Sequence, residues 1–244
     1  MAGERSAEGF GGAGTVAVVA AMVQELGPLR RRLGLRPVAG DVAHLYEGTS
    51  GGRRIVGVVT SMGTAAATDV TSAVLDRYDV DHLLAIGIAG AVAEDLAIGE
   101  LLAPAAVEVE HTGERLDHAP LGGVAPRGTL LSTDRLHNTP EALAELRARD
   151  VVAVDMETAA IALVAAARGV PWSVLRAISD RAGDPLVDDE LLAMTRADGS
   201  ADIGATARYL IRHPGRIPHL ARLGRGMRAA VGTITDATVG VLSS

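Results

Sequence analysis

Acidic side chains recur just after the apolar runs that the sequence predicts to be strands. Glu25, Glu157 and Asp180 each follow one of these runs within a few residues. In an open α/β sheet, ligands gather outside the carboxyl ends of the strands. Carboxylates that meet in one such crevice can act as general acids and bases. The spacing therefore favours acid–base chemistry at one edge of a sheet.

Each of these residues also has a purely structural interpretation. Glu25 and Glu157 fall in the first turns of predicted helices, where the helix dipole favours an acid. Asp180 can cap the segment that follows it. Arg176 lies inside an apolar run and needs an acidic partner if it is buried. The residue pattern alone leaves the structural and the catalytic interpretations open.

The sequence does not indicate a metal or cofactor site. The Gly-Ile-Ala-Gly turn at 87–90 lacks the full dinucleotide-binding fingerprint. His111, His118 and His137 do not have the spacing of metal ligands. The chain contains no cysteine and no lysine, which excludes disulfides, cysteine-based zinc sites, Schiff-base lysines and a Walker lysine.

Composition narrows the classes of partner. The chain has 244 residues, 48% of them hydrophobic, and a net charge of -7. The acidic balance and the five aromatic residues argue against a nucleic acid as the main partner. No apolar run approaches the roughly 20 residues of a membrane span. Residues 1–13 lack the apolar core of a signal peptide, so we expect a flexible N-terminal segment and a cytoplasmic protein.

The order of the predicted elements indicates an α/β fold in one domain, residues 14–244. Strands alternating with helices predict a layered structure with a largely parallel sheet. A hairpin is expected around 49–52, extended chain at 99–111, a loop at 112–127 and a helical C-terminal region. Strands are predicted at 15–22, 82–90, 128–133, 151–156 and 171–180, and helices at 23–34, 64–78, 139–149, 157–169, 188–196 and 203–212.

The motifs at the strand ends resemble those of the nucleoside phosphorylase/nucleosidase superfamily, and most closely its methylthioadenosine/S-adenosylhomocysteine nucleosidase branch. The resemblance spans residues 15–182, and its most specific part pairs DMET at 155–158 with RAISD at 176–180. The other motifs are AAMVQELGPLR, TSMGTAAA, AIGIAGA and LLSTDRLHN. The resemblance implies a three-layer α/β/α fold with a central mixed, largely parallel sheet. It also implies a homodimer and no cofactor.

The resemblance implies roles for three carboxylates in cleaving an N-ribosyl bond. Asp180 matches the acid that protonates the purine N7, so that the base leaves in neutral form. Glu157 matches the residue that holds the ribose hydroxyls, where a carboxylate also stabilises the growing positive charge. Glu25 matches the carboxylate that orients and deprotonates a water molecule on the opposite face.

Other positions match residues that surround the substrate. Met156 is expected to pack beside the sugar, and Ser179 to orient Asp180. Ser61 and Arg176 match residues near the nucleophile and the acid network. The resemblance thus implies a site that needs neither a metal nor a cofactor.

The chain departs from the family pattern around the base. Leu136, followed by His137, stands where the nucleosidases place an aromatic ring, so we expect these two residues to line the base site. The loop at 112–127 is shorter than its counterpart, and the chain after Asp180 is longer. The resemblance therefore predicts the type of reaction more firmly than it predicts the substrate.

The nucleophile is the main choice that the sequence leaves open. A carboxylate at Glu25 repels phosphate and suits water, and Ile88 stands where a serine is usual. The expected activity is hydrolysis of a 5′-modified adenosine such as methylthioadenosine or adenosylhomocysteine. A purine nucleoside phosphorylase and a non-catalytic nucleoside-binding protein are the alternatives.

Overall fold

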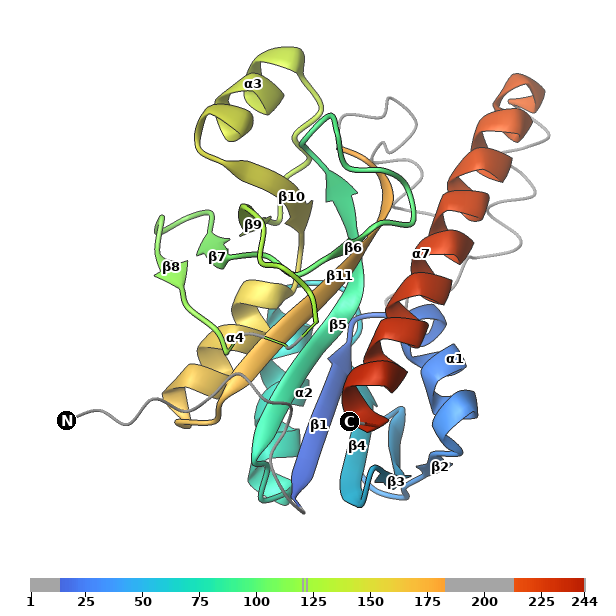
Figure 1. The fold of residues 1–244 in the computed structure, drawn as a ribbon, viewed down its shortest axis with the longest axis vertical. Coiled ribbons are helices and arrows are strands. Elements are labelled where there is room, and N and C mark those ends of the chain that lie inside the picture. Colours follow the sequence, from blue (N-terminus) through green and yellow to red (C-terminus); the bar gives the residue numbers. More distant parts are fainter. Residues whose placement is uncertain (1–13, 120, 122, 183–212, 244) are drawn as a thin grey trace.

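The computed structural model of the chain describes residues 14–119, 121, 123–182 and 213–243. The predictions for 1–13, 188–196 and 203–212 lie outside the described residues. Within the described part, eleven strands form one sheet, in the order β2-β3-β4-β1-β5-β10-β9-β7-β8, with β11 paired to β5 and β6 (Figure 1).

The elements follow the predicted apolar runs closely. The strands are β1 (Thr15–Ala20), β2 (Arg36–Pro37), β3 (Leu45–Ser50), β4 (Arg53–Val59), β5 (His82–Ala91), β6 (Leu101–Leu102), β7 (Ala106–Val109), β8 (Arg115–Leu116), β9 (Thr129–Ser132), β10 (Val151–Asp155) and β11 (Trp172–Arg181). The helices are α1 (Val23–Leu33), α2 (Thr64–Arg77), α3 (Pro140–Ala148), α4 (Thr158–Ala167) and α7 (Ile217–Ser243), with a 3-10 turn at Pro214–Arg216.

The sheet is mixed, with a parallel centre. Strand β1 pairs in parallel with β4 and β5, and β5 pairs in parallel with β11. The β3–β4 hairpin and the β10–β5 pair are antiparallel. Helices α1 and α7 cover one face, and α2 and α4 cover the other (Figure 1). The predicted fold class, a three-layer α/β/α arrangement, is confirmed.

Alternate residues of β1 show how the two layers are held. Val16 and Val18 belong to the apolar cluster that contains Leu26 of α1 and Ala230 of α7. Ala17 and Val19 face the opposite cluster, which contains residues of α2 and α4. Because both faces of the strand are buried, its sequence is continuously apolar rather than alternating.

Strand β5 brings the ends of several strands together. Along one edge, β1 pairs with its first residues and β10 with Gly90 and Ala91. Along the other edge, β11 runs beside it as far as Ala91. The acidic residues that follow β1 and β10, and Asp180 near the end of β11, are therefore gathered around one strand.

Two local predictions have different outcomes. Thr139 caps α3 as expected, since its hydroxyl accepts a hydrogen bond of 3.2 Å from the Ala142 amide. The uniform loop predicted at 112–127 is wrong, because Arg115 and Leu116 form the short strand β8 against β7. Two paired residues are too few to give a periodic signal in the sequence.

Candidate active site

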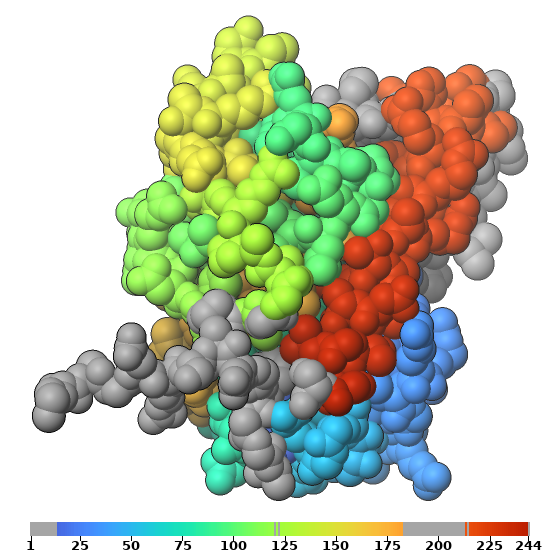
Figure 2. All heavy atoms as spheres, viewed as in Figure 1, coloured from blue at the N-terminus to red at the C-terminus, as the bar shows by residue number. Residues whose placement is uncertain are grey.

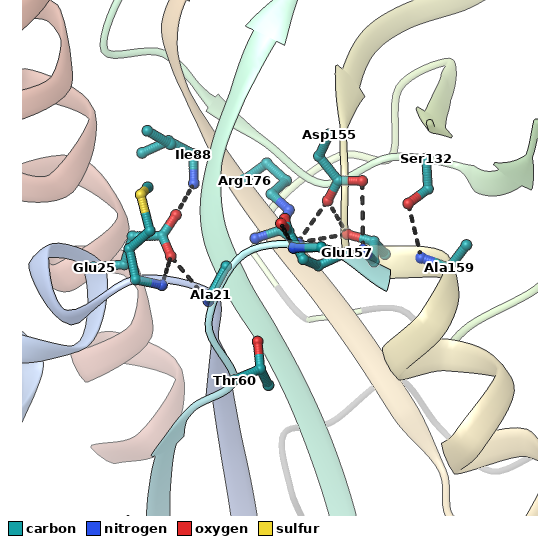
Figure 3. Close-up of polar contacts among 12 residues, drawn as sticks. Ala21, Glu25, Thr60, Ile88, Ser132, Asp155, Glu157, Ala159 and Arg176 are labelled. Atoms are coloured by element: carbon teal, nitrogen blue, oxygen red, sulfur yellow. Dashed lines mark hydrogen bonds and ion pairs between the residues drawn. The ribbon is translucent and has the colours of Figure 1, made fainter. Parts of the chain in front are cut away.

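Glu25 is buried at the start of α1, with 2% of its surface exposed. Its Oε2 accepts hydrogen bonds from the amides of Ala21 and Met22, at 3.0 and 2.9 Å, and its Oε1 accepts one from Ile88 at 2.9 Å (Figure 3). Burial raises the pKa of Glu25, while Arg176 and the backbone donors lower it in part. The carboxylate is fixed in orientation, and burial brings it closer to the pKa that a general base needs at neutral pH.

Arg176 of β11 is buried beside Asp155, the last residue of β10. The guanidinium and the carboxylate are 2.6 Å apart, and each side chain is 3% exposed. The Arg176 guanidinium also donates to the Thr158 hydroxyl at 2.5 Å, and that hydroxyl donates to Asp155. Figure 3 shows Arg176 with Asp155 on one side and Glu25 on the other. The structural interpretation of Arg176 therefore holds, with Asp155 as its partner.

Gly87 of β5 makes room for this cluster. A methyl group on its Cα would lie 2.0 Å from Arg176 Nη1 and 2.7 Å from Glu25 Oε1. Both distances are far below van der Waals contact, so any larger residue here would displace the guanidinium and the Glu25 carboxylate. The guanidinium and the Glu25 carboxylate thus approach each other across the bare backbone of β5.

Glu157 lies between β10 and α4, with 7% of its surface exposed. Its Oε1 accepts a hydrogen bond of 2.9 Å from the amide of Gly63, the residue before α2. Burial, followed by the nearby charge of Asp155, raises the pKa of Glu157 to about 7. The electrostatics also couple Glu157 to Glu25 and Arg176, so the three residues form one cluster.

Asp180 lies near the end of β11, and Ser179 stands next to it. The Ser179 hydroxyl donates to the Asp180 carboxylate. Asp180 lines a pocket of 160 Å³ together with Met156, Leu136 and His137. Whole ligands of drug size occupy roughly 300–1,000 Å³. The pocket therefore fits one part of a ligand, such as a base.

His137 is engaged with its neighbours at the edge of this pocket. Its Nε2 lies 2.9 Å from Glu110 Oε1, and the Thr133 hydroxyl donates to Glu110 Oε2 at 2.5 Å. Leu136 is 38% exposed at the wall of the pocket. An apolar group against Leu136 would cover this exposed surface.

The structure brings most of the predicted residues into two adjoining groups. Glu25, Arg176 and Glu157 form the buried cluster. Asp180, Met156, Leu136 and His137 line the pocket, and Ser179 is joined to it through its hydrogen bond to Asp180. Ser61 stands apart: its backbone has a φ of 73°, and no hydrogen bond within the described residues joins its hydroxyl to Glu25, Arg176 or Asp180.

Asp155 is the residue that the sequence reasoning missed. It lines the Asp180 pocket and also forms the ion pair with Arg176, so it joins the two groups. Its place at the end of an apolar run, in the same DMET motif as Glu157, was an available signal. Among the described residues, no cluster of three or more His, Cys, Asp or Glu side chains has the arrangement of a metal site. In the same part of the chain, no helix combines the length and hydropathy of a membrane span.

The layered sheet with buried carboxylates at its strand ends defines an α/β protein of the nucleoside phosphorylase type. The chain belongs to the phosphorylase superfamily, whose family profile matches residues 15–126 and 114–212. The family expected from the sequence motifs is therefore confirmed.

Curated relatives carry a more specific name. The chain is 28% identical over 204 residues to the 5′-methylthioadenosine/S-adenosylhomocysteine nucleosidase of Bacillus subtilis, which covers 69% of this chain and 86% of that protein. It is 31% identical over 171 residues to the enzyme of the same name from Actinobacillus succinogenes, covering 58% of this chain and 74% of that protein.

Solved structures share the fold at lower sequence identity. The nucleosidase of Neisseria meningitidis, in complex with methylthio-immucillin-A, is 22% identical with a TM-score of 0.71, covering 94% of this chain and 98% of that chain. The S-adenosylhomocysteine nucleosidase of Streptococcus pyogenes is 20% identical with a TM-score of 0.72, covering 96% and 98%. The futalosine hydrolase of Helicobacter pylori is 19% identical with a TM-score of 0.67, covering 94% and 97%.

Proposed function

We propose that this protein is a nucleosidase that hydrolyses the N-glycosidic bond of a 5′-substituted adenosine. Methylthioadenosine and adenosylhomocysteine are the first candidate substrates, because the curated relatives are named for them. These names favour a nucleosidase over a phosphorylase or a non-catalytic binding protein. The buried and hydrogen-bonded carboxylate of Glu25 is the observation that carries the proposal.

Glu25 supports water rather than phosphate as the nucleophile. Three backbone amides hold its two oxygens, so the carboxylate cannot turn away from an incoming group. A buried negative charge repels a phosphate dianion, whereas it accepts a proton from water. Because burial raises the pKa of Glu25, the carboxylate is a better base than an exposed one.

Asp180 supplies the proton to the leaving base. Its place in the pocket with Leu136 puts the carboxyl group beside an apolar surface on which a purine can stack. The Ser179 hydroxyl donates to Asp180 and fixes which carboxyl oxygen faces the base. His137 closes the edge of this base site, and Met156 packs beside the sugar.

Glu157 holds the ribose hydroxyls and stabilises positive charge on the sugar. Gly63 donates to one of its oxygens, which leaves the other for the substrate. Arg176 keeps this group of carboxylates together, and Asp155 sets the position of Arg176. Ser61, in the turn before α2, belongs to the surroundings of the nucleophile, as the resemblance implies. This scheme uses no metal or organic cofactor.

The remaining expectations are part of the same proposal. Residues 14–244 act as one domain. The protein is a cytoplasmic homodimer, as the resemblance to the nucleosidases implies. The absence of cysteine fits a reducing compartment. Sedimentation velocity and cell fractionation test the dimer and the location.

The experiment that tests the function is adenine release by Asp180→Asn. The variant removes the proton donor while keeping the shape of the side chain, so the rate should fall by about a hundredfold or more. Exposed Asp79→Asn is the control and should keep the wild-type rate. Calorimetry should show that Asp180→Asn still binds methylthioadenosine. Near-normal turnover by Asp180→Asn would show that the assigned acid is wrong.

A further inference from the structure

Helices α1 and α7 pack side by side on one face of the sheet (Figures 1 and 2). A groove lies between them. We call it the α1–α7 groove, and its volume is 950 Å³. It shares no residue with the pocket around Asp180. The groove is lined by Val23, Gln24, Gly27, Pro28, Arg31, Arg32, Met227, Arg228, Val231, Gly232, Thr235 and Asp236.

Glycine on each helix opens the groove. A methyl group on Gly232 would meet no atom within 4 Å, and one on Gly27 would meet only Arg31 Nη1, at 3.6 Å. Neither glycine has a backbone conformation that requires glycine, because neither has a positive φ. Larger side chains would fit at both positions and would fill the space between the helices, so the two glycines keep the groove open. The volume falls within the range of small-molecule sites.

The wall of the groove combines apolar surface with two cations. Val23, Met227 and Val231 present half-buried apolar side chains. Arg31 and Arg228 form no ion pair and no side-chain hydrogen bond with any described residue. Their neighbour Arg32 is already paired with Asp236, at 2.6 Å. Two guanidinium groups are therefore available beside an apolar floor.

The local charge differs from that of the whole chain. The chain carries a net charge of -7, yet residues 203–235 contain no aspartate or glutamate. The described part of this stretch contributes Arg216, Arg222, Arg225 and Arg228. A cationic helix in an acidic protein attracts anions to its own surface. The guanidinium group of arginine binds carboxylate and phosphate groups in a bidentate manner.

We propose that the α1–α7 groove binds a small, freely diffusing amphipathic anion. Its alkyl chain lies on Val23, Met227 and Val231, and its carboxylate or phosphate head pairs with Arg31 and Arg228. The apolar floor requires the alkyl part, and the two available guanidinium groups require the anionic head. This site lies beyond the nucleosidase chemistry and does not depend on it.

The test is calorimetric titration of the full chain with decanoate, with decan-1-ol as the uncharged probe of equal chain length. We expect one decanoate per chain and binding of decan-1-ol at least about tenfold weaker. The double variant Arg31→Gln and Arg228→Gln should weaken decanoate binding by at least about tenfold. Arg225→Gln, an exposed arginine of α7 outside the groove, should leave it unchanged.

Filling the groove gives a second, independent variant. Gly232→Leu should abolish decanoate binding, because the new side chain occupies the space that the alkyl chain needs. Gly240→Leu is the matched control: it is an exposed glycine of α7 that also meets no atom within 4 Å and does not line the groove. Both variants should unfold at the wild-type temperature or above, since glycine is a poor helix former.

Four results would overturn the proposal. They are the absence of decanoate binding up to about 1 mM, equal binding of decan-1-ol, wild-type binding by the double arginine variant, and wild-type binding by Gly232→Leu. A change in sedimentation by Gly232→Leu with unchanged decanoate binding would identify the groove as a contact between copies of the chain. Repeating the titration with decyl phosphate and with inorganic phosphate alone distinguishes a carboxylate from a phosphate head group. Binding of inorganic phosphate as tight as that of decyl phosphate would show that the alkyl chain contributes nothing, and would overturn the proposal of an amphipathic ligand.

Discussion

Glu157→Gln should abolish base release and at the same time stabilise the folded protein at alkaline pH. The substitution keeps an oxygen that can accept the Gly63 hydrogen bond and removes only the charge. The substrate then loses the carboxylate that holds its hydroxyls and stabilises positive charge on the sugar. The fold, in contrast, is relieved of an ionised group that is only 7% exposed and lies close to Asp155.

The size of the stabilisation follows from the raised pKa. Glu157 ionises at about 7 in the folded chain, against an ordinary value of 4.5. The folded state therefore holds the proton more tightly than the unfolded state, and ionisation disfavours folding by about 3 kcal/mol. This destabilisation appears as the pH rises from the unfolded pKa to the folded pKa and is complete above it. Glu157→Gln should gain most of that amount at pH 8 and little at pH 4.5.

Urea unfolding at several pH values measures this effect, and adenine release at pH 8 measures the loss of function. The exposed Glu145→Gln in α3 is the control, and it should change neither quantity. A free energy of unfolding for Glu157→Gln that differs from the wild type by the same amount at pH 4.5 and pH 8 would refute the electrostatic argument. Retained activity would refute the role of Glu157 in holding the sugar.

Three further predictions follow from the same cluster. Gly87→Ala should lower the rate of base release by about a hundredfold, because its methyl group displaces Arg176 and Glu25. Steady-state kinetics measures this loss. Asp155→Asn should destabilise the chain by about 3–5 kcal/mol in urea unfolding, since it leaves the buried Arg176 without its acidic partner. The wild-type kcat/KM should fall as the pH drops below the pKa of Glu157, about 7, and Asp155→Asn should move that limb to lower pH, because Asp155 raises the pKa. Wild-type stability in Asp155→Asn, or an unmoved limb, would contradict the assignment of Asp155.

The fold was predictable because its central strands are buried on both faces. Continuous apolar runs such as Thr15–Ala20 can pack only between two layers of helices, and the glycine at 34 marks the end of α1 with a φ of 64°. The short strand β8 and the pairing of β5 with three neighbouring strands depend on contacts between distant residues. Such contacts leave no periodic signal in the local sequence.

The site was predictable as a set of positions and less so as a geometry. The strand-end rule identified Glu25, Glu157 and Asp180 from their places after apolar runs. It did not identify Asp155 as the partner of Arg176, because several carboxylates of the sequence could equally have formed an ion pair with this arginine. The requirement for Gly87 was also hidden, since it arises from side chains that approach from other elements.

Hydrolysis of the N-glycosidic bond is tested by product analysis with and without phosphate. Purified protein is incubated with methylthioadenosine, adenosylhomocysteine, adenosine, inosine and futalosine, and the released base and sugar are separated by chromatography. We predict release of adenine from a 5′-substituted adenosine in the absence of phosphate, with a free sugar as the second product. Base release that requires phosphate and yields a sugar 1-phosphate would contradict the account and place the protein among the phosphorylases.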